Sequence, residues 1–312
     1  MADTLAIEPE TQLPRRFRRS QRMQGKREAS IAFIFLFPNM IGFLVFSAIP
    51  IIAAFVISFY NWDLLLGANF VGLGNYKQLL TDNVFHAALV NTLYFVVVSV
   101  PLAVIVGLGI ALLTNQQLPG MNIYRAIFLL PYVTLTVAIA LVWKWLYLPE
   151  TGLVNQLLSL VGIHGPAWLT SPVWAMPALI LLSVWKSFGY NMVLFLAGLQ
   201  NIPQHLYEAA LMDGASPWQR FRYVTFPLLS PVTFFVVVMT TIGSFQIFDQ
   251  ALVMTQGGPG LATTTLVMNI YQVGFQSFHM GYASAIAWVL FAIVFVCTLI
   301  QFWFQRRLVS YD

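Results

Sequence analysis

The chain has 312 residues, of which 59% are hydrophobic and 8% carry a formal charge, and its net charge is +4 at pH 7. Soluble domains carry charge on about a quarter of their residues, so this composition argues against a soluble protein and indicates an integral membrane protein. Seven of the fifteen Lys and Arg residues lie between Arg15 and Arg27. We interpret this basic tail as the cytoplasmic flank of a membrane helix and not as an arm that binds nucleic acid.

The expected organisation is a polar tail over residues 1–29, a membrane domain over residues 30–307 and a short cytoplasmic end over residues 308–312. Six apolar segments are each long enough to cross a bilayer as a helix of about 20 residues, which predicts an all-α membrane fold. The predicted spans lie within residues 31–62, 85–114, 124–146, 173–199, 228–248 and 282–304. The intervening segments at residues 63–83 and 149–172 contain turn-forming Gly, Asn and Pro, and we expect loops there.

Six spans place both termini on one side of the membrane, and the positive charges predict that this side is the cytoplasm. Twelve of the fifteen Lys and Arg residues are then cytoplasmic, whereas Lys77 and Lys144 face the other side and Lys186 lies within the fourth span. Lys and Arg are strongly enriched in cytoplasmic loops, so the asymmetry supports this orientation. It also places the segment between the fourth and fifth spans in the cytoplasm.

The sequence argues against a disulfide, a metal site and an ATP-binding site on this chain. Cys297 is the single cysteine, which excludes an intrachain disulfide, and the four histidines show no metal-ligand spacing. No G-x-x-x-x-G-K-[ST] segment is present, and a P-loop needs that pattern to hold the phosphates of ATP. We therefore expect no catalytic residue, no metal and no cofactor on this chain, and any ATP and Mg would be held by another polypeptide.

The most patterned polar stretch is residues 201–227, between the fourth and fifth spans. Pro203 suits the start of a helix that continues to Met212, and Gly214 can adopt the left-handed conformation that ends it. A capping-box pattern at residues 216–219 predicts the start of a second helix. The segment is therefore predicted to form two short helices with a sharp joint, exposed on one face of the membrane.

This stretch resembles the cytoplasmic E-A-A loop of bacterial ABC-importer permeases. It keeps the spacing of that motif and departs from it at Val224 and Phe226, where Ile and Leu are usual. In that family the loop is a coupling helix that docks in a cleft of the ATP-binding subunit. The resemblance implies an ATPase-coupling site formed by Glu208, Ala209, Ala210, Asp213, Gly214 and Pro227.

The fourth and fifth spans carry polar side chains that a bilayer penalises unless they line a pathway. They are Ser183, Lys186, Ser187 and Tyr190 in the fourth span, which share one helical face, and Thr240, Thr241, Ser244, Gln246 and Asp249 in the fifth. An intramembrane Lys costs about 2.5–3.5 kcal/mol on insertion scales. We therefore expect Lys186 to face a water-filled cavity and to donate to substrate oxygens. The alternative is a structural pair between Lys186 and an acid such as Asp249.

The sequences W-K-S-F-G-Y-N-M-V-L-F-L-A-G-L-Q before the loop and S-F-Q-I-F-D-Q-A-L-V-M-T-Q-G-G-P with T-T-T after it resemble the permeases of carbohydrate importers. Aligned from the Glu208 motif, the sugar-contacting positions of the maltose-permease branch fall on Ser183, Lys186, Ser187, Tyr190, Thr240, Gly243, Ser244 and Ile247. Gly243 and Ile247 offer no side-chain hydrogen bond, so the identity of the sugar stays open.

The resemblance covers residues 30–310 and implies a non-enzymatic permease subunit that moves a sugar or oligosaccharide across a bacterial or archaeal cytoplasmic membrane. It implies as partners a second permease, usually a different chain, two ATPase subunits and an extracytoplasmic solute-binding protein. A loop formed by Gln256, Gly257, Gly258 and Pro259 would face that binding protein, for docking or gating.

Two other functions stay open at this point. The first is import of glycerol 3-phosphate or a related polyol phosphate, because related permeases share the W-K and T-T-T features and Lys186 can meet a phosphate. The second is ion-coupled secondary transport, which would use buried acids as ion relays. Asp249 is almost the sole candidate for such a relay.

Overall fold

The structure is a computed structural model that describes residues 33, 35–63, 67–116 and 118–308. The predicted tail at residues 1–29, and residues 309–312 of the predicted C-terminal end, lie outside the described residues. The chain divides into two compact units, one ending at Val56 and the other beginning at Ile57, and each is described by itself.

The described part of the first unit is an apolar helix. It begins at Phe35 and ends at Ile57, the residue at which the second unit starts, and it includes a π-helical turn, η1 (Leu44–Ala48), and the segment α2 (Ile49–Ile57). Its 23 residues match the first predicted span and suffice to cross a bilayer.

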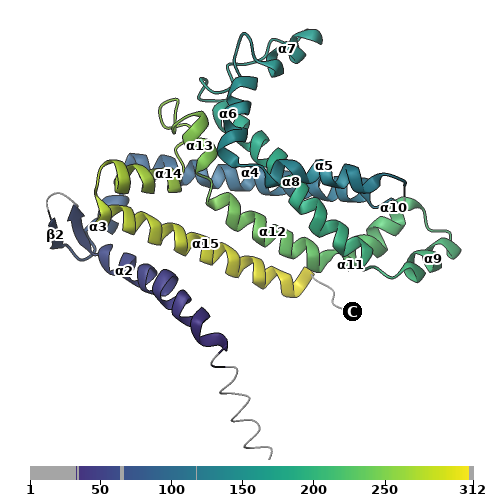
Figure 1. Cartoon of the computed structure of the whole chain (residues 1–312), viewed down its shortest axis with the longest axis horizontal. Helices are drawn as coiled ribbons and strands as arrows, with labels where there is room; N and C mark the ends of the chain where they lie inside the picture. Colours follow the sequence, from purple (N-terminus) through teal and green to yellow (C-terminus); the bar gives the residue numbers. More distant parts are fainter. Residues whose placement is uncertain (1–32, 34, 64–66, 117, 309–312) are drawn as a thin grey trace, which may run out of the picture. The chain divides into compact units, whose positions relative to one another are not determined.

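The second unit is built around long apolar helices. Three of them are long enough to span a membrane: α4 (Asn83–Thr114), α8 (Ala175–Gln200) and α15 (Met280–Leu308). Figure 1 shows α4, α8, α12 (Ser230–Phe245) and α15 running in roughly the same direction, and α4 packs against both α8 and α12. These contacts form the core from which the other elements project.

The two remaining predicted spans are bent helix pairs. The third is formed by α5 (Met121–Val133) and α6 (Thr136–Leu146), which meet at 95°. The fifth begins with the helical segment 217–228, which meets α12 at 66°. Counting each bent pair as one span gives six among the described helices, and the all-α membrane fold is confirmed.

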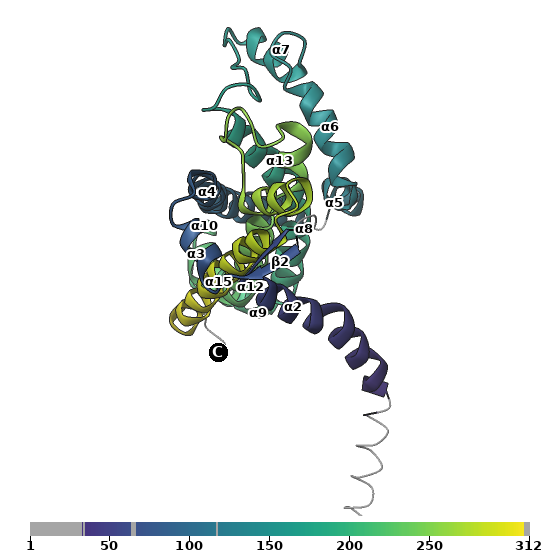
Figure 2. The same ribbon diagram turned by 90° about the vertical axis from the view of Figure 1, so that its left-hand side faces the viewer.

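The third predicted span, residues 124–146, is present but is not one straight helix, because the helix breaks at Thr134 and Leu135. Both residues have extended backbone, with ψ of 145° and 125°. Pro131 has no N–H for the helical ladder, and the Thr134 hydroxyl donates to the carbonyl oxygen of Leu130 at 2.8 Å. Together they favour a helix end at this point, so α6 leaves in a new direction, as Figure 2 shows.

Two segments expected as loops contain short regular elements instead. Two strands, β1 (Tyr60–Asp63) and β2 (Gly67–Phe70), pair with each other, and α3 (Gly74–Leu79) follows them. The strands are antiparallel, with Tyr60 opposite Phe70 and Asp63 opposite Gly67. Asn75 stabilises this arrangement because its amide donates to the carbonyl oxygens of Ser58 and Tyr60 at 2.8 and 2.9 Å.

The second of these segments, residues 149–172, contains α7 (Leu153–Leu160). After α12 the chain forms three more short elements before α15 begins. They are α13 (Asp249–Met254), α14 (Leu266–Tyr271) and the π-helical turn η3 (Gln272–Gln276). All of these are too short to produce the apolar periodicity that reveals a long helix in a sequence.

Glycine allows the helices around α8 to approach closely. A Cβ atom added to Gly189 would lie 2.1 Å from the carbonyl oxygen of Phe128 on α5. A Cβ atom on Gly107 of α4 would lie 2.6 Å from the Cβ atom of Asn191 on α8. Small residues at such contacts let membrane helices pack backbone to backbone.

We predict that Gly189→Ala destabilises the packing of α5 on α8 by about 1–3 kcal/mol, because the new methyl group overlaps a backbone atom that cannot rotate away. The measurement is a thermal unfolding curve of the purified protein in detergent. The control is Gly109→Ala, since a Cβ atom there meets nothing within 4 Å. Equal melting temperatures for the two variants would contradict the close contact.

Candidate functional site

The polar loop after α8 folds as its local sequence predicts. Helix α9 (Gln204–Met212) ends at a left-handed Gly214 with φ of +72°. The capping box is present: the backbone N–H of Ser216 donates to Gln219 Oε1 at 2.7 Å, and the N–H of Gln219 donates to Ser216 Oγ at 3.3 Å. The second helix then runs through α10 (217–220), the π-helical turn η2 (221–225) and α11 (226–228).

This loop presents its motif residues outward. Glu208, Ala209, Asp213 and Gly214 are exposed, Ala210 is half-buried, and Pro227 lies partly buried at the entry to α12. Large apolar side chains are exposed on the same segment, among them Met212 at 89%, Trp218 at 68% and Tyr223 at 75%. Exposed acidic, small and apolar side chains on one short helix pair form a surface suited to a protein partner.

The loop is tied to the bundle at its base. The hydroxyls of Tyr207 on α9 and Thr225 on η2 lie 3.0 Å apart and are hydrogen-bonded. A Cβ atom added to Gly198 on α8 would lie 2.8 Å from Leu229 Cδ1, so α8 and the start of α12 are in close contact. The two arms of the loop are therefore held together where they meet the membrane helices.

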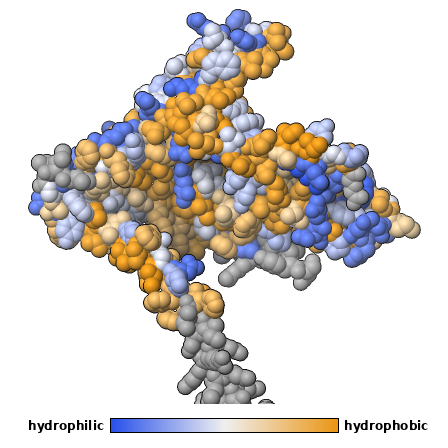
Figure 3. Space-filling view, in the orientation of Figure 1, coloured by the Kyte–Doolittle hydropathy of each residue, from blue (hydrophilic) through white to orange (hydrophobic). Residues whose placement is uncertain are grey.

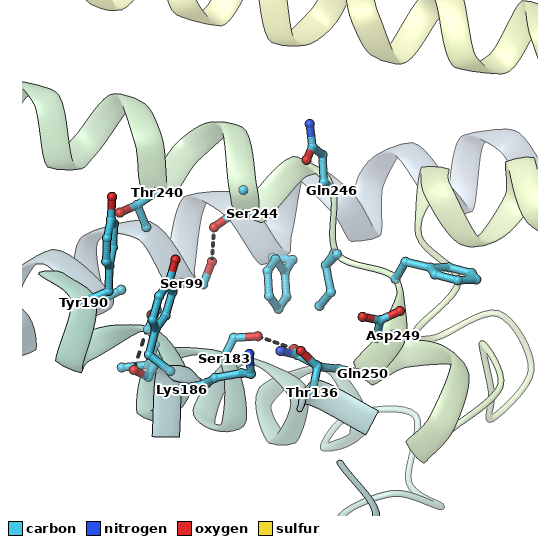
Figure 4. Close-up of a pocket in the computed structure, with 18 of the residues that line it drawn as sticks. Ser99, Thr136, Ser183, Lys186, Tyr190, Thr240, Ser244, Gln246, Asp249 and Gln250 are labelled. Atoms are coloured by element: carbon cyan, nitrogen blue, oxygen red, sulfur yellow. Dashed lines mark hydrogen bonds between the residues drawn. The ribbon is translucent and has the colours of Figure 1, made fainter. Parts of the chain in front are cut away.

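A cavity of about 620 Å³ lies between α4, α5, α6, α8, α12 and α13. All six predicted substrate-binding residues line it: Ser183, Lys186, Ser187, Tyr190, Thr240 and Ser244. Gly243 and Ile247, the other positions implied by the resemblance, line it as well. Residues that the sequence places on two separate spans therefore come together at one site (Figure 4).

Lys186 lies over an aromatic ring in this cavity. Its amine is 5.9 Å from the ring centre of Tyr132, and Tyr132 stacks on Tyr190 with ring centres 4.7 Å apart and an angle of 15°. Among the described residues, the ion pair present is His279 with Asp63 at 3.1 Å, so Lys186 is not paired with Asp249. The cavity alternative from the sequence thus fits the geometry of Lys186, whereas the structural ion pair does not.

Several polar groups of the cavity bond across helices. Ser99 on α4 donates to Ser244 on α12 at 3.4 Å, and Ser183 on α8 donates to the side-chain oxygen of Gln250 on α13. Thr240 donates to Asn191 Oδ1 at 3.4 Å, while the Asn191 amide donates to the carbonyl oxygen of Ala103 at 3.3 Å. These bonds hold four helices around one polar space.

The sequence analysis missed several cavity residues, among them the polar side chains of Ser99, Tyr132, Thr136 and Gln250. Tyr132 and Thr136 flank the unpredicted break between α5 and α6, so their position depends on the bend. Ser99 is one serine within an apolar span and gives no periodic signal. Gln250 directly follows Asp249 and could have been recognised as the end of the polar run in the fifth span.

The predicted docking or gating loop does not line this cavity. Gln256 is exposed and has φ of +53°, Gly257 is buried, and Gly258 and Pro259 are partly buried. The hydroxyls of Thr263 and Thr264 donate to the carbonyl oxygens of Gly258 and Gly257 at 2.7 and 3.1 Å. The T-T-T segment therefore fixes the shape of the loop.

No group of three or more His, Cys, Asp or Glu side chains that could hold a metal ion occurs among the described residues. The cavity itself is lined by hydroxyls, amides, aromatic rings, one lysine and one aspartate, together with aliphatic side chains such as Val184, Met239 and Val267. Such a set can bind a polar molecule by hydrogen bonds and ring contacts.

Residues 88–310 match the protein family described as "binding-protein-dependent transport system inner membrane component". The chain belongs to this family. It is 40% identical to a probable ABC transporter permease, YesP, of Bacillus subtilis over 92% of this chain and 94% of that protein. It is 38% identical to MalF, a trehalose/maltose transport system permease of Thermococcus litoralis, over 88% of this chain and 93% of that protein.

A solved structure has the same fold. A chain of a bacterial ABC transporter involved in import of the acidic polysaccharide alginate aligns with a TM-score of 0.81 over 93% of this chain and all of that chain. Its sequence identity is 24%, so it supports the fold alone. The family match confirms the resemblance drawn from the sequence: the chain is an ABC-transporter permease, a membrane transport component and not an enzyme. It does not support the ion-coupled secondary transporter.

We predict that cysteines introduced at the cavity react with a small water-soluble thiol reagent. In a Cys297→Ala background, Ser187→Cys and Thr240→Cys should react about tenfold faster than Leu182→Cys, because reaction requires a solvated thiolate. Leu182 is the matched control, since it lies on α8 but is fully buried. The rates are measured by mass spectrometry on membranes, and rates at Ser187 and Thr240 as slow as the rate at Leu182 would show that water does not enter the cavity.

Proposed function

We propose that this chain is the membrane-spanning permease of an importer for a sugar or oligosaccharide. The observation that carries the proposal is one cavity that is lined by all six predicted residues and also contains a stacked tyrosine pair. Hydroxyl and amide groups suit the hydroxyls of a sugar, and an aromatic face suits its C–H surface. Relatives named as permeases for trehalose/maltose, lactose and arabinooligosaccharides support the same class.

The proposed assembly contains two permeases, two ATP-binding subunits that hold ATP and Mg, and an extracytoplasmic binding protein. A fold neighbour was solved with a periplasmic protein carrying an alginate pentasaccharide, which supports a binding protein as one partner. The excess of Lys and Arg on one side supports cytoplasmic termini and a cytoplasmic α9. The residues Gln256, Gly257, Gly258 and Pro259 would then face the binding protein.

In the proposed mechanism, ATP closes the two ATPase subunits around α9, and α9 carries that motion to the helices of the cavity. The loop joins the end of α8 directly to the start of α12, and both helices line the cavity. A rigid-body motion at the loop therefore changes which side of the membrane the cavity faces. Glu208, Ala209, Ala210, Asp213 and Gly214 would contact the ATPase, and Pro227 would set the entry to α12.

The first experiment is purification of the tagged chain from its native membrane, with identification of the proteins that accompany it. A second permease, an ATPase and a solute-binding protein are expected, and the ligand of the binding protein names the substrate. A polyol phosphate as that ligand would replace the sugar proposal. A chain that purifies alone and moves solute in liposomes without ATP would overturn the importer assembly.

We predict that Glu208→Lys and Gly214→Val each abolish ATP-driven uptake while the protein still inserts and assembles its helices. Reversing the charge of the exposed Glu208 disrupts its proposed contact with the ATPase. Valine at position 214 must adopt φ of +72°, which costs about 1–2 kcal/mol and distorts the end of α9. Uptake is measured in proteoliposomes with the complete transporter.

Two matched controls separate coupling from general damage in this experiment. Gly162→Val introduces the same strain at φ of +77° in a loop on the opposite side, and Glu150→Lys reverses an exposed acid outside the cavity. Both should transport at the wild-type rate. Normal uptake by the Glu208 and Gly214 variants would refute the coupling role of α9.

A further inference from the structure

The cavity contains two formal charges of opposite sign. Of the residues that line it in the described part of the chain, Lys186 and Asp249 are the ones with a charged side chain. Their charges sum to zero, so the cavity as a whole is electrically balanced. Neither the fold nor the family match assigns a role to this balance.

The two charges come from different walls. Lys186 projects from the middle of α8 and is held over the ring of Tyr132, whereas Asp249 is the first residue of α13. Figure 4 shows the two side chains on different sides of the same space. The hydrogen bond from Ser183 to the Gln250 side chain ties α13 to α8, so the acid is held at a set position relative to the lysine.

The lack of direct contact between these charges has a consequence for binding. Lys186 and Asp249 form no ion pair, so each retains hydrogen-bonding capacity toward a molecule in the cavity. A hydroxyl group both donates and accepts, so an uncharged sugar can accept from the ammonium and donate to the carboxylate. The substrate then bridges the two charges and compensates both of them.

A carboxylate or phosphate on the sugar changes this balance. It is attracted to Lys186 but repelled by Asp249 in the same space, so the two Coulomb energies have opposite signs and offset one another. The anion still gives up hydration when it enters the cavity, and that cost is left uncompensated. An extra negative charge is therefore disfavoured although the cavity contains a lysine.

We propose that Asp249, acting opposite Lys186, makes this cavity select uncharged saccharides over uronates and sugar phosphates. This inference rests on the proposed sugar transport and adds the charge class of the substrate. Asp249 is a specificity residue in this scheme, and Gln250 positions it through the bond to Ser183. The same pair of opposite charges disfavours a polyol phosphate, which the sequence left open as an alternative substrate.

The test is direct binding to the purified transporter in detergent, without the binding protein, by saturation-transfer NMR. The probes are trehalose, maltose, lactose and arabinotriose, each compared with the uronate made by oxidising one primary hydroxyl. Wild type should prefer the neutral sugar. Asp249→Asn leaves the lysine unopposed and should shift the ratio of dissociation constants toward the uronate by about tenfold or more, and Lys186→Gln should shift it the opposite way.

The control is Glu150→Gln, which removes one exposed acid that does not line the cavity and should leave the ratio unchanged. The opposite shifts expected of the two cavity variants keep the test valid if one of them fails to assemble. Neutral-sugar binding with a ratio that neither variant changes would overturn the inference and leave the proposed function standing. A wild-type transporter that binds none of these sugars would instead count against the proposed function.

Discussion

The contact between α4 and α8 is the constraint on which the cavity depends. Asn191 is almost fully buried there, and its amide donates to the carbonyl oxygen of Ala103 on α4 while its oxygen accepts from Thr240 on α12. Gly107 leaves room for this side chain, since a Cβ atom would lie 2.6 Å from that of Asn191. A buried amide without partners is costly, so the three helices are fixed relative to one another.

The break between α5 and α6 is the second constraint, because residues on both sides of it, Tyr132 and Thr136, line the cavity. Tyr132 lies two residues before Thr134, where the helix ends, and there it stacks on Tyr190 and supports Lys186. A straight third span would carry the following residues along the axis of α5. The chain loses helical hydrogen bonds at the bend. In return, Thr136 at the start of α6 lines the cavity together with Tyr132 at the end of α5.

The parts of the fold that depend on neighbouring residues were predictable, and the parts that depend on distant contacts were not. Ser216, Gln219 and Gly214 act within a few residues, so the helix ends of the loop between α8 and α12 follow from sequence alone. The polar face of α8 follows from helical periodicity. The strand pair at Tyr60 and the hydrogen bond between Gln250 and Ser183 depend on partners elsewhere in the fold, and the strand pair's partner is Asn75. No local pattern reveals these pairings.

The loop between α8 and α12 and the cavity are joined by the same two helices, and this determines how the proposed motion would pass between them. Gly198 on α8 contacts Leu229 at the start of α12, and Tyr207 bonds to Thr225, so the base of the loop cannot open without losing both contacts. Force applied to α9 is then transmitted to α8 and α12 as a pair. Because Lys186 lies on α8 and Thr240 on α12, the proposed motion displaces both walls of the cavity together and preserves the site while its exit changes.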